Sequence, residues 1–382
     1  MKVALLTNGL YPFQMGGMQK HSYYLARYLA QKGVQVDVYS YKLEASEKEK
    51  IDRTFTSGEL ENLRFFEIEF PISAYFPGHY LFNSYRHACS IYKKLKENIK
   101  GVDFIYAQGF TGWKLLLEKN SLQPSPPVGV NFHGLEMFQK TANLRSKMEQ
   151  YLFKYPAKLC LQKADIAISL GGKLTQILKN KAGNSTTIWE TPIGIEEKWL
   201  IDKVASSKKR RKFIFIGRYE RRKGIQELNN VVKKLQGKQA FDFEFIGPIP
   251  EGHKLKLSNC HYHGPIYDED NIIKIISGGD VLVCPSYSEG MPTVILEAMS
   301  RGLAVIATDV GAVSELVSSE TGWLIEAANQ PQLEDAMVRA LNVPESELLQ
   351  KKSAALKLIK NRFTWGKVID ITLDKIKDSL PF

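Results

Sequence analysis

Short, uninterrupted apolar runs constrain the fold of this chain more than any other feature of its sequence. Val3–Leu6, Phe213–Ile216 and Val281–Cys284 each consist entirely of apolar residues. A strand with one face in water alternates apolar and polar side chains, whereas a strand covered by helices on both faces does not. The runs therefore predict an α/β fold, with parallel sheets between layers of helices.

The order of these runs predicts two successive sheets. Val3–Leu6 is followed by a loop, a helical pattern at 18–32 and an alternating strand at 34–38. This strand–helix–strand order implies parallel strands, and it begins again after Lys212. The other predicted strands are Val102–Ala107, Val128–Phe132, Asp165–Ser169, Phe241–Ile246 and Ala304–Ala307, and further helices are predicted at Ile225–Leu235 and from about Thr293.

The length of 382 residues accommodates two domains, each with its own core. The segment Glu196–Lys212 is polar, basic and without apolar periodicity, which indicates a domain boundary there. We therefore predict one Rossmann-like domain at 1–195 and a second at 196–362. A helical pattern covers residues 330–380.

The chain is basic, with a formal net charge of +11. This charge favours polyanions, but no nucleic-acid-binding module is recognisable, so we expect no nucleic-acid partner. The four cysteines are widely spaced, which predicts free thiols in a reducing cytosol and neither a disulfide framework nor a zinc site. The apolar run at the N-terminus is too short for a signal peptide, so we expect a cytoplasmic protein.

The segment from Glu289 to Glu297 carries the strongest chemical signal. It follows the predicted strand 281–284 and contains the predicted helix start. Ligands bind beyond the carboxyl ends of strands in an open parallel sheet, and the free N–H groups of a helix start attract an anion such as a diphosphate. Gly290 permits close backbone approach, Glu297 is placed to accept hydrogen bonds from a ribose, and Glu289 precedes the helix where an attached sugar would lie. On spacing alone, two surface carboxylates are the simpler interpretation, and a glycosidase-type pair would require the loop to fold back.

A second segment places two cations at the same predicted sheet edge. The strand 213–216 ends at Gly217 and Arg218, and Lys223 stands at the start of the next helix. The planar guanidinium group of an arginine and the compact ammonium group of a lysine suit a diphosphate leaving group. They would neutralise the charge that develops on it. The alternative interpretation is a basic helix start on the surface.

Three further features accompany predicted strand or helix ends. Gly16-Gly17 precedes a helix, where it either lets backbone N–H groups approach an anion or forms a tight turn. His133 follows a strand and points to the same cleft, unless it is a buried structural histidine. Asp268-Glu269-Asp270 matches the metal-binding pattern Asp-x-Asp, but we interpret it as an acidic helix start and expect no metal.

Together these segments resemble the retaining glycosyltransferases of group 1, also called family four, which have the GT-B fold. The likeness covers most of the chain and is strongest at 290–299 and 307–311. It is moderate at 217–224 and at Gly16-Gly17, and Phe363-Thr364-Trp365 is similar to the beginning of the family's final helix. The resemblance implies two Rossmann-like domains that face a deep cleft, and a helix at 363–382 that crosses back to the N-terminal domain.

The resemblance also implies roles for individual residues. Arg218, Lys223, His133 and Glu289 would act at the catalytic centre, the first two on the diphosphate. The implied donor-binding residues are Gly16, Gly17, Gly217, Gly290, Met291, Pro292, Thr293, Val294, Glu297, Gly247, Pro248, His263 and Gly264, of which 247–248 and 263–264 would meet the base. The segment Pro192-Ile193-Gly194-Ile195-Glu196 lacks an asparagine that many family members carry, so we assign it no site role.

We therefore expect a retaining glycosyltransferase that moves a sugar from a UDP- or GDP-sugar to a hydroxyl of a glycan or lipid-linked glycan in cell-surface polysaccharide synthesis, without a metal or another cofactor. The alternatives are a sugar-nucleotide epimerase of the same fold and a basic nucleic-acid-binding protein. The aromatic and basic stretch Phe65–Ile99 is either a surface that contacts the anionic inner face of the plasma membrane or a core-facing helix with a basic outer face.

Overall fold

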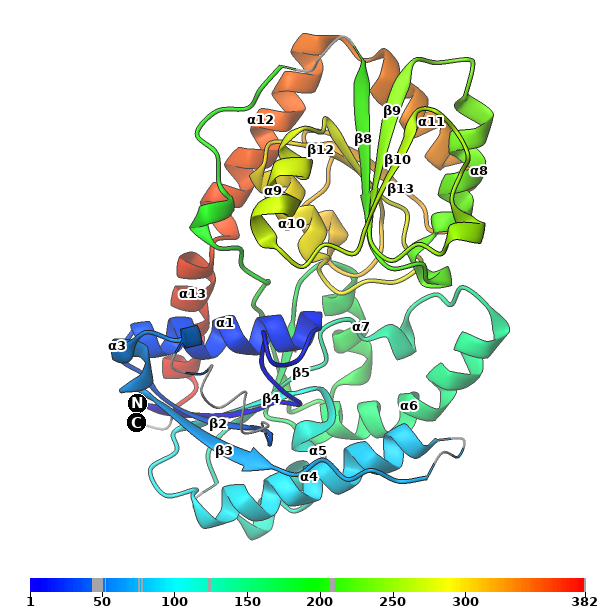
Figure 1. Cartoon of the computed structure of the whole chain (residues 1–382). Helices are drawn as coiled ribbons and strands as arrows, with labels where there is room; N and C mark the ends of the chain where they lie inside the picture. The colour runs from blue at the N-terminus through cyan, green and yellow to red at the C-terminus, as the bar shows by residue number, and fades with distance from the viewer. Residues whose placement is uncertain are drawn as a thin grey trace.

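The computed structural model describes residues 1–42, 51, 53–74, 76, 78–122, 125–206 and 210–380, with the backbone alone at 144–146. It contains two sheets, one above the other in Figure 1, with helices packed around each. The strand pairs described in both sheets are parallel, which confirms the predicted α/β fold. Within the described ranges, no helix has the length and apolar content needed to cross a bilayer.

The first sheet has the strand order β3-β2-β1-β4-β5-β6-β7. The chain moves outward from β1 to β3 and then returns to pair β4 with the other side of β1, so the strand order reverses between β1 and β4. The strands are β1 (Lys2–Leu6), β2 (Gln35–Tyr41), β3 (Leu63–Ile68), β4 (Phe104–Gln108), β5 (Val128–Asn131), β6 (Ile166–Ser169) and β7 (Thr187–Glu190). The helices are α1 (Gly17–Gln31), α3 (Ser57–Leu60), α4 (His79–Glu97), η1 (Gly109–Gly112), α5 (Trp113–Leu117), α6 (Leu144–Lys163) and α7 (Lys173–Lys181).

The second sheet repeats this topology in the order β10-β9-β8-β11-β12-β13, with the reversal between β8 and β11. Phe213, Phe215 and Phe243 are fully buried in its core. The strands are β8 (Arg211–Ile216), β9 (Phe241–Ile246), β10 (Cys260–Gly264), β11 (Val281–Cys284), β12 (Ala304–Thr308) and β13 (Gly322–Ile325). The helices are α8 (Ile225–Leu235), α9 (Glu269–Ser277), α10 (Thr293–Ser300), α11 (Gln330–Asn342) and α12 (Glu345–Arg362).

The strands predicted from apolar runs are confirmed, with small shifts at their ends. β11, β9 and α8 have the predicted bounds, and β4 begins at Phe104 where the prediction began at Val102. The outer strands β3, β7, β10 and β13 were not predicted. They lie at or next to a sheet edge, and β10 alternates between half-buried and exposed residues, so it has no apolar run to detect.

The chain crosses between the domains after β7 and again after α12, and the two crossings pair with each other. Ile195 N donates a hydrogen bond of 2.8 Å to the carbonyl oxygen of Phe363, and Trp365 N donates one of 3.0 Å to that of Ile195. After the second crossing, α13 (Trp365–Asp378) packs against α1, with the rings of Trp365 and Tyr28 stacked 5.9 Å apart. This confirms a C-terminal helix that crosses back to the N-terminal domain (Figure 1).

Candidate active site

At the strand-order reversal of the second sheet, three loops are pressed together. Gly224 has a φ of 68°, and a Cβ there would lie 2.0 Å from the carbonyl oxygen of Pro285 after β11. Gly247 after β9 has a φ of 134°, and its Cβ would lie 2.1 Å from the carbonyl oxygen of Gly217 after β8. Glycine is therefore required at both positions. The loops form one continuous edge at the point where open parallel sheets bind ligands.

Lys223 and Glu289 meet on this edge. Lys223 Nζ lies 2.6 Å from Glu289 Oε1, and Ser286 Oγ donates a hydrogen bond of 2.7 Å to the same oxygen. Arg222 Nη1 lies 3.7 Å from Glu289 Oε2. The side chains of Lys223 and Glu289 are only 15% and 9% exposed, so little water competes with the pair. A carboxylate held in this way is oriented to accept hydrogen bonds, and the cations beside it are placed to neutralise an anion.

Arg218 lies farther out, on the rim. Its side chain is 68% exposed, and its Nε lies 2.9 Å from Glu220 Oε1. Glu220 Oε2 also accepts a hydrogen bond of 2.9 Å from Arg222 Nε. The structure thus brings Lys223 to Glu289 and leaves Arg218 paired with Glu220. Arg222, which the sequence analysis did not single out, occupies the inner position.

The N-terminus of α10 opens toward the first domain. Its N-cap is Pro292, and no described side chain caps the helix. The first-turn amides of Thr293 and Val294 are therefore placed for a ligand that accepts hydrogen bonds. Thr293 also lines a small cavity together with Gly17, the first residue of α1. Gly17 thus lies across this cavity from the helix start, and the role predicted for Gly16 and Gly17 in ligand binding stays a prediction.

Gly290 brings the two domains into backbone contact. A Cβ at this position would lie 3.3 Å from the Cα of Gly134 and from the carbonyl group of His133. This spacing is tighter than most Cβ contacts, so even an alanine would press on the facing loop. The neighbouring Met291 has a buried side chain, so only its backbone can contribute to a site.

Glu297 is paired with a lysine from the other domain. Lys20 Nζ of α1 lies 3.4 Å from Glu297 Oε1 and 3.6 Å from Glu269 Oε1. Burial opposes a charge on Lys20, but the two carboxylates outweigh it, so the pKa of Lys20 is raised. Lys20 was not predicted from the sequence. Its signal is a cation in the first turn of a helix, where the helix dipole disfavours positive charge.

His133 belongs to a hydrogen-bonded chain that the sequence did not indicate. Its Nε2 lies 2.5 Å from Gln108 Oε1, and Gln108 Nε2 lies 3.0 Å from His21 Nδ1. Burial lowers the pKa of His133 to about 4, and burial followed by the nearby His133 lowers that of His21. Both rings are therefore neutral near pH 7. The glutamine fixes the tautomers, because its oxygen accepts from Nε2–H of His133 and its amide donates to His21.

The residues expected to contact the nucleobase of the donor lie together at the ends of β9 and β10. Gly247 N donates a hydrogen bond of 2.8 Å to the carbonyl oxygen of Gly264, so 247–248 and 263–264 form one surface. The His263 ring is engaged elsewhere, with Nε2 lying 2.7 Å from Glu244 Oε2. Burial raises the pKa of Glu244, but hydrogen bonds from Lys212 and His263 outweigh it and the pKa is lowered. Only the backbone around His263 is therefore placed for a ligand.

On the N-terminal side, a cavity of about 360 Å³ opens from the cleft. Aromatic side chains from η1, α4, α6 and the segment after β5 form much of its wall, and Arg222 and Ser288 of the second domain close one side. The aromatic residues are Tyr80, Phe110, Phe132 and Phe153. This space lies next to Glu289, because Arg222 contacts both.

The segment 192–196, which received no site role, lies at the hinge between the domains. A Cβ on Gly194 would lie 2.8 Å from the Cα of Trp365, so the two crossings approach as closely as glycine allows. Glycine at this position therefore serves the packing of the hinge.

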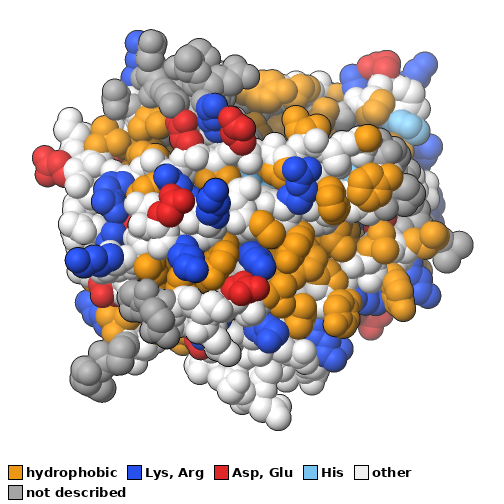
Figure 2. All heavy atoms as spheres, turned by 90° about the horizontal axis from the view of Figure 1, so that it is seen from below, with side chains coloured by type: hydrophobic (Ala, Val, Ile, Leu, Met, Phe, Trp, Pro, Cys, Tyr) orange, Lys and Arg blue, Asp and Glu red, His pale blue; other side chains and the backbone are white. Residues whose placement is uncertain are grey.

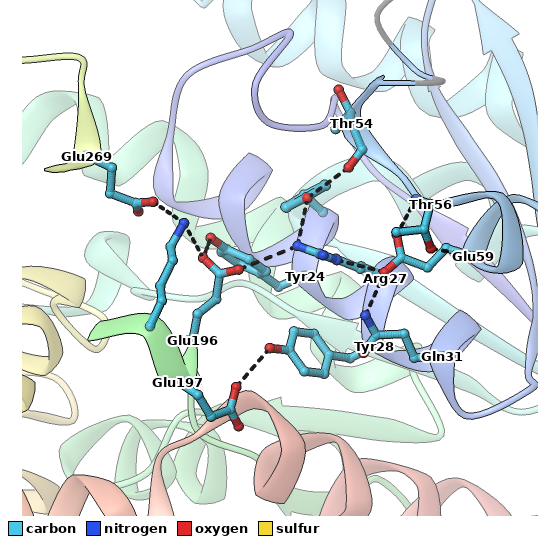
Figure 3. Close-up of polar contacts among 12 residues, drawn as sticks. Tyr24, Arg27, Tyr28, Gln31, Thr54, Thr56, Glu59, Glu196, Glu197 and Glu269 are labelled. Atoms are coloured by element: carbon cyan, nitrogen blue, oxygen red, sulfur yellow. Dashed lines mark hydrogen bonds and ion pairs between the residues drawn. The ribbon is translucent and has the colours of Figure 1, made fainter. Parts of the chain in front are cut away.

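Glu196 at the end of that segment anchors a polar network between α1 and the second domain (Figure 3). It accepts a hydrogen bond of 2.5 Å from Tyr24 Oη, and Arg27 Nη1 lies 3.5 Å from its other oxygen. Lys198 pairs with both Glu196 and Glu269, which ties the network to α9. Figure 3 also shows Gln31, Thr54, Thr56 and Glu59 in this network and, beside it, the separate hydrogen bond from Tyr28 Oη to Glu197.

The motif Asp268-Glu269-Asp270 forms a helix start, as predicted. Asp268 is the N-cap of α9, and its side chain accepts a hydrogen bond of 3.3 Å from Asp270 N. Glu269 pairs with Lys20 and Lys198. Within the described part of the chain, His, Cys, Asp and Glu side chains do not gather in threes suited to a metal ion.

Comparison with known proteins matches each of the two domains to a family of glycosyltransferases. Residues 15–197 match the family described as Glycosyltransferase Family 4, and residues 210–343 match the family described as Glycosyl transferases group 1. The first match covers the first sheet except β1, and the second covers all the strands of the second sheet. The two halves therefore match families of the kind that the sequence motifs resembled.

Individual relatives agree with this placement. The chain is 28% identical over 192 residues to the putative teichuronic acid biosynthesis glycosyltransferase TuaC of Bacillus subtilis (strain 168), covering 48% of each chain. It is 37% identical over 110 residues to the UDP-Gal:alpha-D-GlcNAc-diphosphoundecaprenol alpha-1,3-galactosyltransferase of Escherichia coli, covering 28% of this chain and 27% of the relative. The chain thus matches less than half the length of each of these relatives.

A solved structure extends the likeness to the whole chain. Sucrose-phosphate synthase from Thermosynechococcus elongatus superposes with a TM-score of 0.79 at 18% identity, covering 99% of this chain and 98% of that one. This confirms the predicted fold of two Rossmann-like domains that face each other.

Proposed function

Because residues 15–197 and 210–343 both match families of glycosyltransferases, we propose that the chain transfers a sugar from a nucleoside diphosphate sugar to a hydroxyl group. The observation that carries this proposal is the contact of Lys223 with Glu289 at the sheet's switch point, beside the open N-terminus of α10. A cation and a helix start suit a diphosphate, and a fixed carboxylate suits the hydroxyls of a sugar.

The donor lies on the second domain. Its diphosphate contacts Lys223 and the amides of Thr293 and Val294, while Arg218 leaves Glu220 to approach from the rim. Glu297 accepts hydrogen bonds from the ribose, and Glu289 with the backbone of 290–292 holds the sugar. The nucleobase meets the surface formed by 247–248 and 263–264. The positive charge of Lys223, Arg218 and the N-terminus of α10 takes the place of a divalent cation.

The reaction proceeds with retention of the anomeric configuration, by departure and attack on the same face of the sugar. The leaving phosphate accepts the acceptor's proton, since burial lowers the pKa of His133 to about 4, which makes its ring a weak base, and its Nε2 proton is held in the bond to Gln108. His133 then contributes position and polarity beside the anomeric carbon. Closure of the domains excludes water, which limits hydrolysis of the donor.

The acceptor enters from the N-terminal side, through the aromatic cavity. One relative is named for a donor, UDP-Gal, and for an acceptor that carries a diphosphoundecaprenol. A cavity with aromatic walls next to a basic rim suits a glycan attached to such a lipid. We place the enzyme accordingly on the cytoplasmic side, peripheral on the inner face of the plasma membrane, in cell-surface polysaccharide synthesis.

Donor binding is the first test. Melting temperature is measured with UDP-glucose, UDP-galactose, UDP-N-acetylglucosamine and GDP-mannose, because a ligand that binds only the folded protein raises it. At least one donor is expected to raise the melting temperature of the wild type, and Glu297→Gln should weaken its affinity about tenfold by removing charged hydrogen bonds to the ribose. If no nucleoside diphosphate sugar shifts the transition, the donor assignment fails.

The reaction itself is tested by proton NMR with the donor that binds. Incubation with saccharide acceptors should give a product with the anomeric configuration of the donor, at a rate unchanged by EDTA. An inverted product, or a loss of activity in EDTA restored by a divalent cation, would contradict the mechanism. Donor incubated alone should stay unchanged, because conversion without an acceptor would identify an epimerase.

A further inference from the structure

Helix α6 exposes an apolar stripe that a water-facing helix should not have. Met148, Tyr151, Leu152 and Tyr155 follow the spacing i, i+3, i+4, i+7, which normally faces a core. Here all four are exposed, with Tyr151 and Tyr155 at 77% and 76%. The opposite face of α6 packs into the first domain through residues such as Ala157, Cys160 and Leu161. The helix is therefore apolar on two faces, and one of them has no cover within the described chain.

The beginning of α4 continues this stripe into a broader patch. Phe76, just before α4, and Tyr80 and Phe82, in its first turn, are exposed. The Tyr80 ring lies 5.8 Å from the ring of Phe153 on α6, so the two helices join. Figure 2, which views the molecule from below, shows hydrophobic side chains gathered over this face with Lys and Arg around them. We call this face, made of Phe76, Tyr80, Phe82, Met148, Tyr151, Leu152 and Tyr155, the α4–α6 surface.

The charges beside the α4–α6 surface are mainly positive. Lys147, Lys154 and Lys158 are exposed on α6. Arg86 of α4 lies over the Phe82 ring, 5.7 Å from its centroid. Glu149 is the one acidic residue of α6. Apolar and tyrosine side chains among lysines and arginines fit the interface of a bilayer that contains anionic lipids. A second copy of the chain would set these cations against each other, which disfavours self-association.

The α4–α6 surface also borders the aromatic cavity. Tyr80 belongs to both, and Phe153 joins the surface to the cavity's inner wall, where its ring lies 6.0 Å from that of Phe110. At the far side the cavity meets Arg222 and Ser288, next to Glu289. A cavity with aromatic rings in its wall therefore connects the outer surface of the first domain with the candidate reaction centre.

We propose that the α4–α6 surface docks on an anionic bilayer and holds the mouth of the aromatic cavity against it, so that an acceptor anchored in the bilayer enters the cleft directly. This inference rests on the proposed function for the nature of the acceptor. It adds a surface that includes α6, whose sequence gave no amphipathic signal. Docking also fixes the orientation of the enzyme, with α4 and α6 toward the lipid and the second domain away from it.

The test is cosedimentation of the full chain with vesicles of phosphatidylcholine, alone or mixed with phosphatidylglycerol. Wild type is expected to bind the mixed vesicles and to bind the neutral ones much more weakly. The double variant Tyr151→Ser/Tyr155→Ser should bind at least about tenfold more weakly. Lys154→Gln and Lys158→Gln should each weaken binding about fivefold. Tyr267→Ser is the matched control, because Tyr267 is equally exposed, at 79%, but lies on the second domain, and it should bind like wild type.

Hydrogen exchange of the same chain with and without the mixed vesicles locates the contact. Protection is expected at 78–86, 136–142 and 147–158, and protection confined to the second domain would overturn the proposal. So would equal binding by wild type and the tyrosine variant, or a dimer in light scattering that the tyrosine variant abolishes without lipid. Donor-induced stabilisation is measured in parallel. If no donor stabilises the wild type, the proposed function fails whatever the vesicles show, whereas failure of docking alone leaves it standing.

Discussion

The two sides of the cleft are built differently. On the C-terminal side, polar groups from adjacent loops converge on one sheet edge, and the pair of Lys223 and Glu289 is shielded from water. On the N-terminal side, a cavity with aromatic walls is assembled from α1, η1, α4, α6 and the segment after β5. A sheet edge fixes its groups by topology, whereas a cavity between helices depends on packing over long distances in the sequence. Under the proposed function, the C-terminal side is therefore suited to a donor with constant features, and the N-terminal side can change with the acceptor.

The largest effect is expected from Lys223→Ala, which tests whether the C-terminal side carries the chemistry. Removing this shielded cation should lower kcat about 100- to 1000-fold, because charge that develops on the leaving phosphate loses its main partner. Arg218→Ala should lose less, since that side chain lies on the rim. Initial rates at saturating donor measure both. Lys233→Ala, on the exposed face of α8, is the control and should match wild type. Full activity in Lys223→Ala would overturn the site.

Gly224→Ala tests whether the same side depends on close packing of its loops. The added Cβ would lie 2.0 Å from the Pro285 carbonyl oxygen at a φ of 68°, so the loops after β8 and β11 must separate. We expect a loss of about 3 kcal/mol in the free energy of unfolding, measured by urea denaturation. Gly237→Ala has a φ of 74° but meets nothing within 4 Å, so it should cost only about 1 kcal/mol. Equal losses would show that backbone strain alone, and not loop contact, sets the cost.

Acid should lower the free energy of unfolding through two buried histidines of the N-terminal domain. Burial lowers the pKa of His87 and of His133 to about 4, below the usual value near 6.5. Between these values the unfolded chain binds protons that the folded chain does not, so stability is lost as pH falls from about 6.5 toward 4. Each histidine should cost about 2 kcal/mol by pH 5, in urea denaturation compared with pH 7. His87→Leu should reduce the loss, and an unchanged pH dependence would contradict the assignment.

The smallest effect is expected from Gln108→Leu, which separates positioning on the N-terminal side from donor binding. The substitution breaks the bonds to His133 and His21, so the His133 ring loses its fixed tautomer. We expect kcat to fall about tenfold, with donor affinity in the melting-temperature assay unchanged. A Gln108→Glu variant, which keeps an acceptor for His133, should recover part of the rate. A loss of donor affinity in Gln108→Leu would show that the two sides are not separable.

The sequence predicted the C-terminal side better than the N-terminal side for a physical reason. Apolar runs such as Val281–Cys284 locate the strands, and parallel strands end at a common edge, so the meeting of Lys223 with Glu289 follows from topology. Arg218 pairs with Glu220 within one loop, and no periodicity in the sequence indicates which partner a loop side chain takes. The contact of Lys20 with Glu297 joins residues far apart in the chain, so it required the packing of both domains.

The exposed aromatic surface could also be predicted only in part from the sequence. The stretch Phe65–Ile99 was recognised as aromatic and basic, and exposed aromatic residues do lie at the start of α4. Helix α6 was overlooked because its apolar residues lie on opposite faces, which cancels the amphipathic signal. Only the folded domain distinguishes the face that packs inside from the face that remains outside.

The paired crossings at Ile195 and Phe363–Trp365 have a mechanical consequence. Two bodies joined by one flexible strand can swivel in every direction, whereas two strands bonded side by side resist torsion and leave bending as the soft motion. We therefore expect any movement of the second domain to follow a single arc about these paired segments. Closure along one arc would bring the C-terminal side of the cleft to the same alignment with the N-terminal side each time, so the hinge would fix that alignment in advance of binding.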